Sequence, residues 1–129
     1  MADTYTLMHL EDVDDSAPKF GYGELQEARF ATGDLRAEAT GVTFHRIKPG
    51  KRQPFGHRHE DAEEVNVILS GSGRVKLDDD IVELDALHAL RISPGVARCF
   101  EAGPDGMEYL VFGPQHKGDG ELLQGWWSD

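Results

Sequence analysis

The chain has 129 residues, 39% of them hydrophobic, and a formal net charge of −11. This length is typical of one domain, so we expect a single domain over residues 1–129 with its core at about 41–112. The acidic charge argues against nucleic acid, which binds clustered Lys and Arg, and against anionic membranes. A single cysteine excludes an intrachain disulfide, and the acidic N-terminus is unlike a signal peptide, so we expect a cytoplasmic protein.

The first half of the chain predicts three strands. Residues 4–9 form a short segment that we expect to be an edge strand, and residues 16–23 read as a loop. Residues 24–31 predict a second strand, because a glycine soon interrupts any helical pattern. Residues 41–48 alternate in character and end at the turn pair Pro49-Gly50, which predicts a third strand.

The second half predicts further short strands separated by turn residues. We expect them at 65–69, 74–77, 81–84, 87–92, 96–101 and 107–112, with turns at 71–73, 78–80, 94–95 and 104–106. A glycine-rich tail with two tryptophans follows from residue 113. Many short strands without a long helix predict an all-β sandwich or barrel. Composition does not separate a jelly roll from an immunoglobulin-like sandwich or an up-and-down barrel.

The segment 56–73 carries the chemistry. His57 and His59 are two residues apart, so their side chains share one face of an extended segment. Glu64 opens the strand that follows. Two imidazoles and one carboxylate on a shared face suit a divalent transition metal, and iron, manganese, nickel and zinc are all chemically admissible.

This spacing resembles the first motif of the cupins. Four residues separate His59 from Glu64, six separate Glu64 from Gly71, and Pro49-Gly50 precedes the motif. The resemblance covers residues 41–112, because 87–100 are similar to the strand, Pro-Gly turn and strand of the second cupin motif. It implies a double-stranded β-helix (jelly-roll) barrel, often dimeric, whose pocket holds a metal on His57, His59 and Glu64.

The second motif departs from the family pattern. Gly95 is present, but other expected positions hold different residues, namely Leu87, Ser93 and Ala102. Six residues rather than five separate Gly50 from His57. The family's fourth ligand, a histidine, is replaced by Arg98, and a guanidinium stays protonated and does not ligate a metal.

Arg98 permits two interpretations. It pairs with Glu64 in a metal-free pocket, since buried charges need partners. Alternatively, the metal stays on the other three residues and Arg98 binds an anionic substrate, such as a carboxylate or phosphate, beside it. We expect Gln53 and Phe55, just before the histidines, to contact the same ligand at the pocket rim.

Fold alone does not select a function. The first hypothesis is a metal-dependent oxygenase, isomerase or lyase acting on a small molecule. The alternatives are a non-catalytic small-molecule binder or sensor, and a metal-free sugar-modifying cupin. We also expect a homodimer that uses an N-terminal edge strand, on the basis of the family and of the need to cover exposed strand edges.

Overall fold

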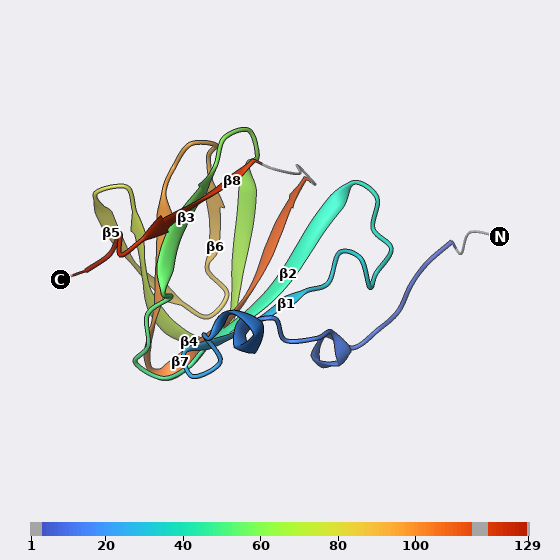
Figure 1. The fold of residues 1–129 in the computed structure, drawn as a ribbon, viewed down its shortest axis with the longest axis horizontal. Helices are drawn as coiled ribbons and strands as arrows, with labels where there is room; N and C mark the ends of the chain where they lie inside the picture. The colour runs from blue at the N-terminus through green and yellow to red at the C-terminus, as the bar shows by residue number, and fades with distance from the viewer. Residues whose placement is uncertain (1–3, 115–118, 129) are drawn as a thin grey trace.

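The computed structural model describes residues 4–114 and 119–128 of the chain. Within these ranges it contains two short 3-10 helices and eight strands (Figure 1). They are η1 (Leu10–Asp12), η2 (Ala17–Phe20), β1 (Gln26–Phe30), β2 (Thr40–Ile47), β3 (Phe55–His59), β4 (Glu64–Leu77), β5 (Asp80–Asp85), β6 (Ala89–Ile92), β7 (Arg98–Pro114) and β8 (Gly120–Gln124). None of the helices in these ranges has the length and apolar character needed to cross a bilayer.

Antiparallel pairing curls the strands into two facing layers. One layer contains β1, β2, the second half of β7, the first half of β4, and β6. The other contains β8, β3, the first half of β7, the second half of β4, and β5. The long strands β4 and β7 therefore belong to both layers, as Figure 1 shows. This arrangement confirms the predicted all-β jelly roll.

The predicted turns at 71–73 and 104–106 are wrong, because β4 and β7 run through them without ending. The two strands instead bend together, with register shifts on β4 at Ile68/Ser70 and Gly71/Gly73. A Cβ on Gly71 would lie 2.0 Å from the carbonyl oxygen of Gly106, and Gly71 also has a φ of +78°. Glycine is required at this corner because the two backbones approach too closely for any side chain.

The predicted edge strand at 4–9 is also wrong. The structure contains no strand at 4–9, and the side chains of Tyr5 and Leu7 are 81% and 91% exposed. An isolated apolar alternation does not make a strand when no neighbouring strand supplies hydrogen bonds. The loop expected at 16–23 contains the short helix η2.

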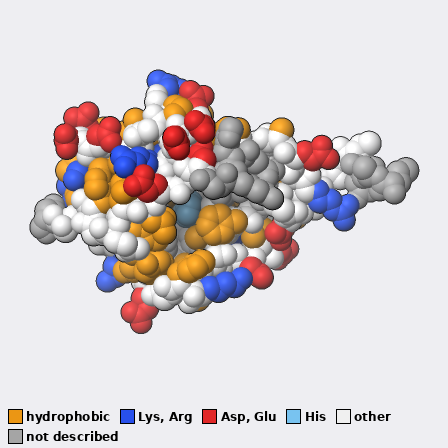
Figure 2. All heavy atoms as spheres, turned by 45° about the horizontal axis from the view of Figure 1, so that its top comes forward, with side chains coloured by type: hydrophobic (Ala, Val, Ile, Leu, Met, Phe, Trp, Pro, Cys, Tyr) orange, Lys and Arg blue, Asp and Glu red, His pale blue; other side chains and the backbone are white. Residues whose placement is uncertain are grey.

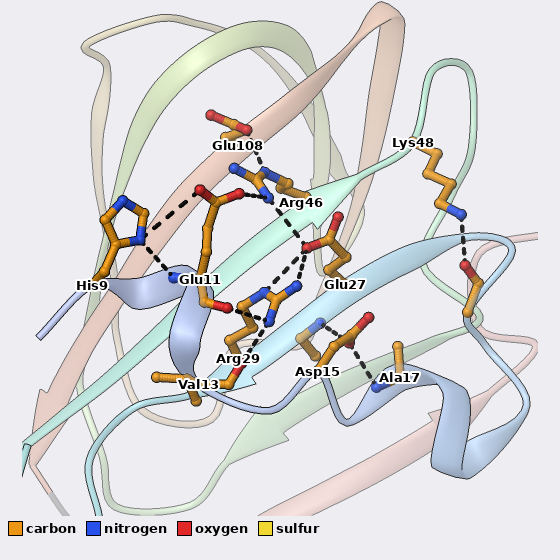
Figure 3. Close-up of polar contacts among 12 residues, drawn as sticks. His9, Glu11, Val13, Asp15, Ala17, Glu27, Arg29, Arg46, Lys48 and Glu108 are labelled. Atoms are coloured by element: carbon orange, nitrogen blue, oxygen red, sulfur yellow. Dashed lines mark hydrogen bonds and ion pairs between the residues drawn. The ribbon is translucent and has the colours of Figure 1, made fainter. Parts of the chain in front are cut away.

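Residues 13–22, here called the N-terminal strap, are tied to β1 (Figure 3). Asp15 accepts hydrogen bonds from the backbone N–H groups of Ala17 and Ala28, at 3.0 and 2.9 Å. Arg29 donates to the carbonyl oxygen of Val13 from the same side. These contacts hold the strap against the sheet, where it forms one wall of the cavity described below.

Strand β8 was missed by the sequence prediction. It pairs along the whole of β3, from Phe55 opposite Gln124 to His59 opposite Gly120. Its residues lack a clear alternation of apolar and polar side chains, so β3 and not local sequence decides its conformation. Beyond it, Trp127 is buried and lies beneath the guanidinium of Arg52, 4.0 Å from the ring centroid.

The hydrophobic core lies between the two layers. Its members are Ile47, Ile68, Val75, Leu84, Ile92, Phe100, Ala102, Met107 and Tyr109. Most come from β4 and β7, because these two strands contribute inward-facing side chains to both layers. The core closes one end of the barrel and leaves a cavity at the other.

Candidate metal centre

Three predicted ligands meet at the floor of the cavity. His57 and His59 lie on β3, and Glu64 is the first residue of β4. One ligand atom from each residue lies within 4.8 Å of the other two. The Nε2 atom of His59 is 3.4 Å from Oε2 of Glu64, and the two imidazole rings are nearly perpendicular with centroids 5.3 Å apart.

The donor set fits a divalent transition metal. Bonds of about 2.0–2.2 Å place neighbouring ligand atoms about 3–4 Å apart, so small side-chain rotations would close the group around an ion. Two imidazoles and one carboxylate would also leave positions open to a ligand or water. The neighbouring carboxylate, Glu63, is exposed and pairs with Arg91 at 3.5 Å, so Glu64 is the acid that faces the histidines.

Arg98 joins the group from the first residue of β7, directly opposite His57. Its side chain is 1% exposed, and its Nη2 atom lies 3.4 Å from Oε1 of Glu64. Its Nη1 donates to the carbonyl oxygen of Val96. Burial lowers the pKa of Arg98 while Glu64 opposes that change, and a guanidinium remains a cation across the physiological range. Glu64 thus directs one oxygen towards His59 and the other towards Arg98.

The surroundings keep His57 neutral. Burial, followed by the positive charge of Arg98, lowers the pKa of His57 to about 3. A neutral imidazole offers the lone pair that a metal requires. The same cation that excludes a fourth protein ligand therefore favours the ligating form of the first.

Asp119 supports His59 and was not anticipated from the sequence. The Oδ1 atom of Asp119 lies 3.0 Å from Nδ1 of His59. Because this contact holds the imidazole by Nδ1, the Nε2 atom of His59 points towards Glu64. Asp119 also accepts hydrogen bonds from the backbone N–H groups of Glu60, Asp61 and Ala62. A carboxylate behind a ligating histidine fixes the ring orientation and raises its basicity.

Above the centre lies a cavity of about 460 Å³. Figure 2 shows hydrophobic side chains around a hollow with a histidine visible inside it. Gln53 and Phe55 both line the cavity. The Gln53 amide is already engaged, because it donates to the hydroxyl of Tyr109 and accepts from the N–H of Phe100.

Three buried polar atoms in the described residues have no hydrogen-bond partner: His45 Nδ1, Asn66 Nδ2 and Arg98 Nε. All three residues line this cavity. Neither Asn66 nor His45 was among the site residues predicted from the sequence. Buried polar groups without a hydrogen-bond partner are rare and destabilising. Because three of them lie around one cavity, we infer that a ligand or water bound there supplies their partners.

His45 lies deep in this wall. Its ring stacks on Tyr109 with centroids 5.0 Å apart. Burial lowers its pKa to about 4, although a backbone hydrogen bond with Glu27 opposes the shift. His45 therefore stays neutral at physiological pH and adds no charge to the floor.

No family model matches the sequence, and the search of curated proteins gave no significant match. Solved structures do match. A cupin protein from Bacteroides fragilis is 24% identical with a TM-score of 0.70, over 98% of this chain and 93% of that one. The polyketide cyclase RemF from Streptomyces resistomycificus is 22% identical with a TM-score of 0.76, over 96% and 87%. Oxalate decarboxylase from Bacillus subtilis is 18% identical with a TM-score of 0.75, over 95% of this chain and 33% of the enzyme.

These likenesses show the fold. The chain has the double-stranded β-helix fold of the cupins, as its sequence motif predicts. Its candidate centre is a His-His-Glu group whose glutamate is paired with the buried Arg98.

Proposed function

We propose that this protein binds a divalent transition metal on His57, His59 and Glu64 and transforms a small molecule in the cavity above it. The reaction classes that we propose are oxygenation, isomerisation and elimination of the lyase type. The convergence of three ligand atoms within 4.8 Å at the cavity floor carries the proposal. Iron, manganese, nickel and zinc all suit this donor set.

Each residue at the floor has a distinct task in this proposal. His57 and His59 supply neutral nitrogens, and Asp119 orients the second of them. Glu64 supplies the negative charge, and Arg98 holds its outer oxygen. When bound, the metal would act as a Lewis acid towards an oxygen atom of the ligand.

Two named structural neighbours support an enzymatic role. RemF is a polyketide cyclase, and the Bacillus subtilis protein is an oxalate decarboxylase. Another neighbour, a variant of PAC13 from Streptomyces, is described with uridine. Binding of a small molecule is thus compatible with this fold.

The ligand that we propose is a small molecule carrying a carboxylate or phosphate. Contacts from Arg98, Gln53 and Phe55 to that ligand stay predictions, as does a cytoplasmic location. A homodimer also stays a prediction, now without the N-terminal strand that was expected to form it. Light scattering at high micromolar concentration tests the dimer, and a monomer there would contradict it.

A metal-free binding protein is the second candidate, and the Glu64–Arg98 pair favours it. This ion pair occupies one oxygen of Glu64 without any metal. Buried opposite charges satisfy one another in this way, and removing one of them leaves the other uncompensated. The two candidates therefore predict different consequences for the same substitution.

The experiment compares Glu64→Gln with Glu63→Gln in protein purified without a metal-affinity tag. A metal centre predicts that Glu64→Gln lowers metal content at least tenfold, whereas Glu63→Gln retains it because Glu63 is exposed. His57→Ala should lower metal content equally. If the wild-type protein retains no metal after incubation with manganese, iron, nickel or zinc, and Glu64→Gln lowers the free energy of unfolding by about 3 kcal/mol, the metal-free candidate is correct.

A further inference from the structure

The walls of the cavity differ in chemistry from its floor. Large apolar side chains surround the space above the metal ligands: Phe20, Tyr22, Phe30, Phe55, Phe100 and Leu122. Tyr22 and Phe55 form a tilted aromatic pair with centroids 5.7 Å apart. The contact between these rings makes a continuous aromatic surface against which a flat apolar body can pack.

Three of these wall residues are exposed although they are large and apolar. Phe20, Phe30 and Leu122 are 69%, 54% and 60% exposed. They come from the strap, β1 and β8, and they line one cavity. Exposed apolar side chains that gather at a pocket, rather than singly, indicate a surface that a ligand covers.

The charges at the floor define the other end of the ligand. Glu64 and Arg98 form an ion pair, and the Asp119 carboxylate contacts His59 on the side of the ring away from Glu64. A bound dication would therefore leave the floor positively charged, inside walls of low polarity where charge interactions are strong. The N–H groups of Asn66 and Arg98 that lack partners lie at the same end.

We infer that the cavity takes an aromatic acid, with its carboxylate at the floor and its ring system between the apolar walls. This inference rests on the proposed function for the metal that attracts the carboxylate. A sugar fits these walls poorly, because its hydroxyl groups need polar partners at every face. The polar residues that line the walls are mostly small or already engaged: Ser16 and Thr43 are small, Gln53 donates to Gln26 and Tyr109, and Glu121 is engaged by Arg58 at 2.9 Å. His45 and Asn66 each carry one buried polar atom without a partner, which is too few for the hydroxyl groups of a sugar.

The experiment measures binding of acetate, benzoate, 2-naphthoate and glucuronate to zinc-loaded protein by calorimetry. All four probes share a carboxylate, so differences in their affinity report on the body of the ligand. Burying the second ring should raise affinity about tenfold from benzoate to 2-naphthoate. Glucuronate should bind no more tightly than acetate.

Rim variants locate the binding site. Phe20→Ser and Phe30→Ser should each weaken 2-naphthoate binding at least threefold and leave zinc and acetate affinity unchanged. Ile81→Ser is the matched control, because Ile81 is 49% exposed on β5 and does not line the cavity. Ile81→Ser should leave the affinities for zinc, acetate and 2-naphthoate unchanged.

The outcomes separate this inference from the proposed function. If zinc binds but all four probes bind with the same affinity, or glucuronate binds as tightly as 2-naphthoate, the inferred aromatic ligand is wrong. The metal centre is then unaffected. If zinc fails to bind while the metal-free protein still prefers 2-naphthoate through Phe20 and Phe30, the metal centre is wrong and the aromatic class stands. If the rim variants alter only the oligomeric state in light scattering, a second copy covers these side chains and the inference is overturned.

Discussion

The floor and the rim of the cavity are built from different kinds of structural element. The floor residues lie on β3, β4 and β7: His57 pairs with both β7 and β8, Arg98 with both β3 and β4, and Glu64 with β6. The rim residues lie on the N-terminal strap, β1 and β8, at the margins of the layers. Positions on paired strands are constrained by two registers at once, whereas positions at margins change with little effect on the fold. The floor is therefore suited to chemistry, and the rim to selecting a ligand.

The largest effect should come from the corner that lets β4 and β7 serve both layers. Gly71→Ala should lower the free energy of unfolding by about 3 kcal/mol or more, because it combines an unfavourable φ with a Cβ that overlaps a carbonyl oxygen. Urea denaturation measures this loss. Gly33→Ala is the control, since a Cβ at Gly33 meets no atom within 4 Å. Equal effects for both variants would contradict the role of the corner.

Acid should destabilise the metal-free protein through His45. The folded-state pKa of His45 is about 4, whereas the unfolded chain takes up this proton near 6.5. Stability attributable to His45 is thus complete above pH 6.5 and falls by about 3 kcal/mol as pH drops to 4. Denaturation curves across this range should show a shallower pH dependence for His45→Gln. The control variant His88→Gln should retain the wild-type dependence of the free energy of unfolding on pH. If His45→Gln also retains it, His45 is solvated in the folded protein and this prediction is wrong.

Removing the carboxylate behind His59 should weaken the metal centre without unfolding the protein. Asp119→Asn keeps one oxygen, which can still accept from the backbone N–H groups of Asp61 and Ala62, but it removes the charge and the acceptor beside the imidazole of His59. We expect metal affinity to fall about 10–100-fold, as for other carboxylates that orient histidine ligands. Competition with a chromophoric chelator measures this affinity. Glu121→Gln breaks only an exposed ion pair with Arg58 and should leave metal affinity intact.

The smallest effect should come from the rim in the absence of ligand. Phe20→Ser should change the free energy of unfolding by less than about 0.5 kcal/mol, because an exposed side chain contributes little to the core. Thermal or urea unfolding of the variant beside the wild type checks this expectation. A loss of several kcal/mol would mean that the strap is part of the core and that floor and rim are not separable.

Short-range spacing was sufficient to predict which three side chains converge at the candidate metal centre. His57 and His59 share a face because a strand has a period of two, and a following strand places Glu64 beside them after a short connection. The positions of β1 and β2 followed from alternation and turn residues for the same local reason. The cupin-like spacing then predicted the jelly roll, which the structural likenesses confirm.

Tertiary structure alone decided the rest. Asp119 reaches His59 from far along the chain, because β8 pairs with β3 and brings the segment before it to that edge. Asn66 looks like an ordinary strand residue until the barrel closes and leaves its amide in the cavity wall without a partner. The strand that was predicted at 4–9 but is absent, and β8, which was not predicted but is present, have the same explanation. A strand exists only where a neighbour accepts its hydrogen bonds, and the sequence determines which residues alternate but not which edge is free to receive them.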